Sequence, residues 1–101
     1  MGKKLPPKEM ELYRRTDEIL HYLWDPCGIA DASKARDEYH SYLPQVFKLV
    51  LNKATEKEIA DYLLEIEVGS MGLAETPEKL NGLLRIAEIL LESRECIIEE
   101  P

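Results

Sequence analysis

Apolar residues recur at helical spacing in four successive stretches of this 101-residue chain, and this repeat constrains the fold more than any other feature. No stretch alternates apolar and polar residues over the length of a strand. A chain of this length suits a single domain. We therefore predict an all-α fold: a compact bundle of four helices with short connections, formed by residues 7–101 after a flexible lead-in at residues 1–6.

The first helix is expected to run from Pro7 to Trp24, where the turn Asp25-Pro26-Cys27-Gly28 ends it. Its residues at helical spacing predict a buried face made of Leu12, Tyr13, Thr16, Ile19, Leu20 and Leu23. The second helical stretch runs from about Ala32 to Asn52 and contains Pro44 on its solvent side. It is either one kinked helix or two abutting helices split at Pro44.

The last two helices have clear start signals. Thr55 and Glu58 have the spacing of a capping box before the third helix, which Gly69 ends. Thr76-Pro77 is a cap followed by proline, and it opens a fourth helix that runs to Ser93 or beyond. Ile86 and Ile89 widen the apolar arc of this helix beyond half its circumference. The helix is therefore either central in the bundle or part of a subunit interface, which would make a homodimer through Ile86 and Ile89.

Charge is distributed unevenly along the chain, whose formal net charge is −7. Residues 54–101 carry twelve acidic and four basic groups, so they contain the whole excess. The acids in this half lie at helical spacing and are predicted to line one face of each helix: Glu58, Asp61 and Glu65 on the third, and Glu88, Glu92, Glu95 and Glu99 on the fourth. They form either an ordinary solvated face or a salt-sensitive docking surface for a basic protein partner. A nucleic-acid partner is not expected, because phosphate contacts need a basic face.

The sequence contains no recognisable catalytic or metal motif. His21, His40 and Cys27 match no zinc spacing, and no nucleophile elbow or phosphate-binding loop occurs. We therefore expect no metal, no cofactor and no enzymatic activity. Cys27 and Cys96 are too few and too far apart for a disulfide framework, and no apolar run approaches the length of a membrane span. A cytoplasmic protein without membrane contact is the simplest interpretation.

One group of residues could form a second site around the turn after the first helix. It brings together the only tryptophan, an aspartate before proline, and an arginine flanked by acids, and it consists of Trp24, Asp25, Arg36, Asp37, Tyr39 and Tyr42. In a structural interpretation, Arg36 clamps Asp25 and the tyrosine hydroxyls find buried partners. In a functional interpretation, the same residues line a pocket for a small molecule, as a binder or a minor enzyme.

Several of these residues belong to a recognisable pattern. Trp24-Asp25-Pro26-x-Gly28-Ile29, Ala35-Arg36-Asp37-Glu38-Tyr39-x-x-Tyr42, Ile59-Ala60-Asp61-Tyr62-Leu63 and Met71-Gly72-Leu73 follow one another in this order. The chain thereby resembles a family of small uncharacterised bacterial all-helical proteins. It departs from the family pattern at Cys27, where an aliphatic residue is usual, and at His40, where an acid is common. The resemblance implies a small helical bundle of bacterial origin, and it carries no established activity.

These observations favour a non-enzymatic protein–protein interaction module with an acidic face. Its most concrete form is an immunity or antitoxin-like protein that covers a basic partner. The alternatives are the small-molecule binder or minor enzyme at the Trp24 turn and a homo-oligomeric structural protein.

Overall fold

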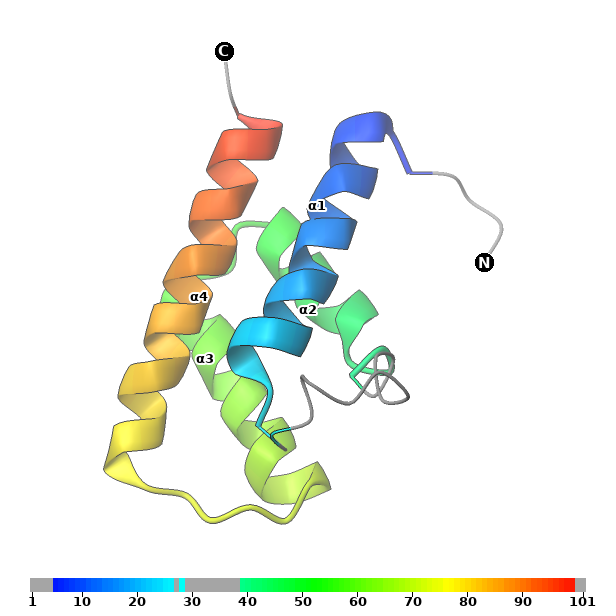
Figure 1. Cartoon of the computed structure of the whole chain (residues 1–101). Helices are drawn as coiled ribbons and strands as arrows, with labels where there is room; N and C mark the ends of the chain where they lie inside the picture. The colour runs from blue at the N-terminus through cyan, green and yellow to red at the C-terminus, as the bar shows by residue number, and fades with distance from the viewer. Residues whose placement is uncertain (1–4, 27, 29–38, 100–101) are drawn as a thin grey trace.

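Four α-helices and two π-helical segments make up the part of the chain that the computed structural model describes, residues 5–26, 28 and 39–99 (Figure 1). The α-helices are α1 (Pro7–Glu18), α2 (Leu43–Leu51), α3 (Glu56–Glu65) and α4 (Pro77–Ile98). The π-helical segments are η1 (Ile19–Trp24) and η3 (Ile66–Ser70), which continue α1 and α3. Within these ranges there is no β-strand, and the predicted all-α bundle of four helices is confirmed.

The longest helix, α4, is central in the bundle. It packs against α1, α2, α3 and η1, and it runs beside α1 in the opposite direction (Figure 1). Ala87 and Leu90 are completely buried, while Ile86 and Ile89 are half-buried against the core. The wide apolar arc of this helix is thus explained by its central position, the first of the two explanations that the sequence allowed. A homodimer through Ile86 and Ile89 stays a prediction.

The buried apolar side chains form one cluster to which every helix contributes. Leu12 of α1, Val46 of α2, Ile59 of α3 and Leu90 of α4 have no exposed surface. Burying a side chain of this size is worth about 1.5–3 kcal/mol. The cluster therefore supplies the main stabilisation of the bundle and fixes the relative positions of the helices that carry the polar residues described below.

The π-helical segment η1 changes which residues of the first helix face the core. The Asp25 N–H donates to the Leu20 carbonyl, 3.0 Å away and five residues earlier, so the turn holds one residue more than an α-helical turn. The core-facing position after Leu20 therefore moves from Leu23 to Trp24. The prediction that Leu23 is buried is wrong, because this side chain is 54% exposed, whereas Trp24 and His21 are buried.

The turn after Trp24 uses two residues with left-handed backbone conformation, Asp25 at φ 31° and Gly28 at φ 68°. The Gly28 N–H donates to the Asp25 carbonyl at 3.1 Å. Glycine adopts this conformation without steric cost, as the sequence predicts for this turn. Aspartate is one of the few other residues that tolerate it.

Helix α2 begins at Leu43, later than predicted, with Pro44 in its first turn. The predicted helix from Ala32 is wrong for residues 39–42, which form turns. In a continuous helix the Pro44 ring would clash with the His40 carbonyl, and Pro44 has no N–H that could donate a hydrogen bond to this carbonyl. Here that carbonyl accepts the Leu43 N–H at 3.3 Å, so the helix starts afresh, which is the split form of the prediction. The earlier part of the predicted helix lies outside the described residues.

Both predicted helix starts in the second half of the chain are confirmed. The Thr55 hydroxyl accepts the Glu58 N–H at 3.1 Å, and the Glu58 carboxylate accepts the Thr55 N–H at 2.8 Å. The Thr76 hydroxyl likewise accepts the Lys79 N–H at 3.3 Å. These contacts satisfy N–H groups that have no partner inside the helix.

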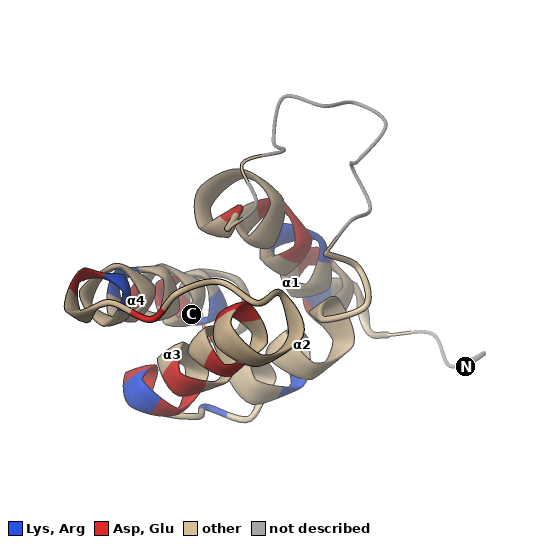
Figure 2. Cartoon of the chain, turned by 90° about the horizontal axis from the view of Figure 1, so that it is seen from below, with Lys and Arg blue, Asp and Glu red and all other residues tan. Residues whose placement is uncertain are grey.

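The charged side chains differ between helices in number and sign. On α3 and α4 the acidic residues outnumber the basic ones, whereas α2 carries one lysine and no acid (Figure 2). The negative excess is largest on α3, which carries four acidic residues and one lysine, whereas α1 and α4 each carry four acidic and three basic residues.

Candidate functional site

The three acidic residues predicted on the third helix are all exposed, but two of them have contacts within the chain. Glu58 closes the capping box with Thr55. The Asp61 carboxylate lies 2.7 Å from Lys57 Nζ, one helical turn earlier. Glu65 has no ion pair among the described residues. Exposed pairs within one helix are worth a few tenths of a kcal/mol, so Asp61 can exchange Lys57 for another cation at little cost.

A hollow of about 400 Å³ lies beside this acidic face, where α3 passes into η3. Three acidic residues and three residues without charge line it: Asp61, Glu65, Glu75, Leu64, Val68 and Gly69. Leu64 and Val68 give it an apolar wall, and Val68 is among the exposed large apolar residues of the protein. Lysine and arginine side chains have an apolar stem and a cationic head. The lining of this hollow is complementary to both parts.

The negative charge of Glu65 also acts on a neighbouring tyrosine. Burial, followed by the Glu65 carboxylate and then by Tyr42, raises the pKa of Tyr62 above its ordinary value of 10.0. Burial and the nearby Glu65 carboxylate both disfavour the deprotonated, negatively charged form of Tyr62. Tyr62 therefore stays a neutral residue beside the acidic face.

The acids predicted on the fourth helix are divided between paired and unpaired residues. The Glu88 carboxylate accepts a hydrogen bond from Arg85 Nη1 at 2.7 Å, and this contact raises the pKa of Arg85 above its ordinary value. Glu92 and Glu95 are exposed, and the described residues provide no ion pair for either. Arg85 therefore neutralises the predicted acidic ridge at Glu88.

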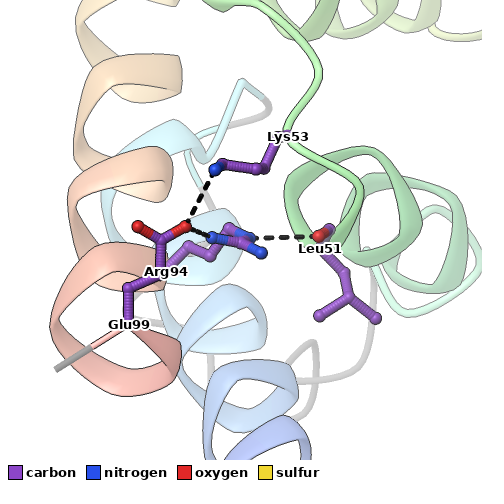
Figure 3. Close-up of polar contacts among 4 residues, drawn as sticks. All are labelled: Leu51, Lys53, Arg94 and Glu99. Atoms are coloured by element: carbon purple, nitrogen blue, oxygen red, sulfur yellow. Dashed lines mark hydrogen bonds and ion pairs between the residues drawn. The ribbon is translucent and has the colours of Figure 1, made fainter. Parts of the chain in front are cut away.

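Glu99, the last predicted acid, is held by two cations from different elements (Figure 3). Arg94 Nη1 donates to its carboxylate, and Lys53 Nζ lies 3.2 Å from the same oxygen. Arg94 Nε also donates to the Leu51 carbonyl at 3.0 Å. The hydrogen bonds from Arg94 and then Lys53 lower the pKa of Glu99 below its ordinary value. Glu99 thus takes part in a contact between α2 and α4, and Asp61 and Glu65 remain the stronger candidates for partner contact.

The predicted site at the Trp24 turn is partly assembled in the structure. Trp24 Nε1 donates to Glu67 Oε2 at 2.8 Å, and Lys79 Nζ lies 3.4 Å from the other carboxylate oxygen. Trp24 and Glu67 are both buried. This contact fastens η1 to η3 and to the first turn of α4.

The tyrosines complete the same assembly. The Tyr39 hydroxyl donates to Asp25 Oδ1 at 2.8 Å. The Trp24 ring centroid lies 5.3 Å from that of Tyr39 and 6.3 Å from that of Tyr42, so the three rings pack together. Arg36 and Asp37 lie outside the described residues, so the predicted clamp between Arg36 and Asp25 stays a prediction. The described contacts join Trp24, Asp25, Tyr39 and Tyr42 to one another, and the choice between the structural and the functional interpretation stays open.

Three residues that sequence reasoning missed connect the helices: Glu67, Lys79 and Arg94. Glu67 follows Ile66 and breaks the expectation that acids stay exposed. Its only signal in the sequence is indirect, since a buried tryptophan N–H needs an acceptor. Arg94 gives no such signal, because its acceptor is a backbone carbonyl.

Metal-binding side chains do not cluster in the part of the chain that the structure describes: no three of its His, Cys, Asp and Glu residues lie together in a way that could hold an ion. His40 Nε2 lies 3.1 Å from Asp17 Oδ1, and the rings of His21 and Tyr22 pack edge to face.

No helix in the described ranges combines the length and the apolar character that crossing a bilayer requires.

Comparison with known proteins finds no matching family model, no matching curated protein and no matching solved structure. The resemblance to a family of small bacterial proteins therefore stays a prediction.

Proposed function

We propose that the protein is a non-enzymatic interaction module that binds a basic protein partner through the C-terminal end of α3. The observation that carries this proposal is the hollow whose lining combines the acidic residues Asp61, Glu65 and Glu75 with the apolar residues Leu64 and Val68. A lysine or arginine of the partner would place its stem on Leu64 and Val68 and its cationic head among the carboxylates.

The charge of the whole chain supports the same proposal. A net charge of −7 attracts a basic protein over distance and raises the rate of encounter. Salt screens this attraction, with a Debye length of about 8 Å at physiological ionic strength. Binding is therefore expected to weaken steeply as the salt concentration rises.

The most concrete form of this function is that of an immunity or antitoxin-like protein that covers the basic surface of a toxin. The small helical fold and the acidic face both suit a protein that acts by covering a surface. The proposal includes a cytoplasmic location, where the exposed free thiol of Cys96 would remain reduced.

An affinity purification from the native host tests the proposal with three baits. The first is the wild-type protein, and the second carries Glu65→Lys and Glu75→Lys. The third carries Glu92→Lys and Glu95→Lys, which make the same change of charge on exposed positions of α4.

We expect the wild-type bait to recover a basic protein at low salt and to release it at high salt. The α3 variant should bind that protein more than about tenfold more weakly, because like charges would meet in the contact. The α4 variant should retain most of the affinity. An acidic partner, binding that ignores salt, or an equal loss in both variants would contradict the proposal.

A further inference from the structure

The guanidinium of Arg94 has a second contact besides the one with Glu99. Its side chain is only 12% exposed, and its Nε donates to the Leu51 carbonyl at 3.0 Å. Leu51 is the last residue of α2, where carbonyl groups have no donor within the helix. The end of α2 therefore orients the guanidinium, and Nη1 would point in the same direction if Glu99 moved away.

Lys53 has a backbone conformation that costs energy. Its φ is 62°, in the left-handed region that favours glycine. The Lys53 N–H donates to the Val50 carbonyl at 3.1 Å and the Ala54 N–H to the Leu49 carbonyl at 3.0 Å, which is the Schellman pattern at a helix end. Glycine is usual at this position, but here the position holds a cation beside Arg94.

A small hollow lies where the two cations meet. Its volume is about 200 Å³, and it is lined by Lys53, Ala54, Leu91, Arg94, Glu95 and Glu99. Ala54 and Leu91 give it an apolar side. The carboxylate of Glu99, whose side chain is 40% exposed, takes the hydrogen bonds of both cations (Figure 3). Glu99 follows the last residue of α4, so its side chain can leave without uncovering the core.

We propose that Lys53 and Arg94 form a binding site for a small monocarboxylate, and that Glu99 occupies this site in the free protein. Glu99 shows that a carboxylate fits between the two donors. The ligand has to be small, since the hollow is below the roughly 300–1,000 Å³ of sites for drug-sized molecules. Its apolar part would lie against Ala54 and Leu91.

Glu95, the other acidic residue that lines the hollow, limits the negative charge that a bound ligand can carry. Glu95 stays beside the site and disfavours any additional negative charge there. A ligand with two negative charges, such as inorganic phosphate, meets this repulsion more strongly than a monocarboxylate does. The site is therefore expected to prefer propionate to phosphate.

Glu99 competes with any ligand because it is tethered to the same chain. Tethering gives a group an effective concentration in the millimolar range or above. Wild-type protein should therefore bind a monocarboxylate much more weakly than a protein that lacks the Glu99 carboxylate. The site does not overlap the hollow at α3, so this proposal does not depend on the proposed function.

Titration of Glu99→Ala with sodium propionate tests the proposal, followed by the NMR signals of Arg94 Nε–H and of the Lys53 and Ala54 amides. We expect saturable shifts of these signals with a dissociation constant on the order of millimolar. Wild-type protein and the control Glu92→Ala, which removes an exposed acid outside the hollow, should bind at least about tenfold more weakly. Glu99→Gln provides a second opened site that keeps the size of the side chain.

A double variant and its matched control test whether Lys53 takes part in the binding. Glu99→Ala with Lys53→Ala should lose most of the affinity, whereas Glu99→Ala with Lys57→Ala should keep it, since Lys57 pairs with Asp61 on α3. The proposal is overturned if neither Glu99 variant gives saturable shifts. It is also overturned if phosphate binds as tightly as propionate, or if the loss of Lys53 changes nothing.

Discussion

Two polar clusters lie near opposite ends of α4, and they use similar groups in different surroundings. Near its start, the Glu67 carboxylate meets Trp24 Nε1 and Lys79 Nζ. Near its end, the Glu99 carboxylate meets Arg94 Nη1 and Lys53 Nζ. The Glu67 side chain is 7% exposed, whereas that of Glu99 is 40% exposed.

This difference in exposure separates a structural contact from an exchangeable one. A buried donor that loses its acceptor keeps the full cost of its desolvation. Exposed ion pairs contribute little, since water and salt replace either partner. We therefore expect the Glu67 cluster to determine stability and the Glu99 cluster to be open to ligands.

Glu67→Ala should give the largest effect. It leaves the buried Trp24 N–H without its acceptor and removes the ion pair of Lys79, so the free energy of unfolding should fall by about 2–3 kcal/mol. Urea denaturation followed by Trp24 fluorescence measures it. Glu65→Ala, at an exposed position on the same helical run, is the control, and an equally small change in both variants would refute the structural role.

Tyr39→Phe should have the second largest effect. It removes the hydrogen bond to Asp25 while keeping the buried ring, so we expect a loss of about 1–2 kcal/mol in urea denaturation. Tyr42→Phe serves as the matched control, because the described residues provide no hydrogen bond for its hydroxyl. A loss at Tyr42 as large as that at Tyr39 would argue against a specific role for the Asp25 contact.

Lys53→Gly should change stability by less than about 0.5 kcal/mol in the same assay. Glycine relieves the left-handed strain, but it adds freedom to the unfolded chain and removes an exposed ion pair. These opposing effects nearly cancel. A loss above about 1 kcal/mol would mean that the exposed cluster stabilises the fold after all.

The pH dependence at Glu99 should be the smallest effect. Its pKa is lowered in the folded protein, so the contribution of Glu99 to stability is present above its unfolded pKa and is lost as the pH falls through the folded pKa. The melting temperature of wild type relative to Glu99→Gln should therefore decrease below about pH 4.5. A difference between the two proteins that is constant from pH 7 to pH 3 would contradict the lowered pKa.

The sequence predicted the features that depend on local chemistry. The caps at Thr55 and Thr76 were predictable because each combines a side-chain acceptor with a nearby backbone N–H. The start of α2 was predictable only as an alternative, since Pro44 allowed both a kink and a split. The apolar spacing on α4 indicated its central position but could not distinguish it from an interface.

The features that the sequence did not reveal depend on contacts between distant segments. The partners of Glu67 lie on η1 and α4, and the acceptor of Arg94 is the backbone of α2. The two π-helical segments also escaped prediction, because a period of 3.6 residues assumes an uninterrupted α-helix. Leu23 was misplaced for this reason.

The surplus residue in η1 has a consequence for changes in chain length. A π-helical turn contains one residue more than the α-helical turn it replaces. Deleting Leu23 would bring Trp24 to the position at which an uninterrupted α-helix faces the core. This segment should therefore accept a one-residue deletion that few other helices in a tightly packed protein would tolerate.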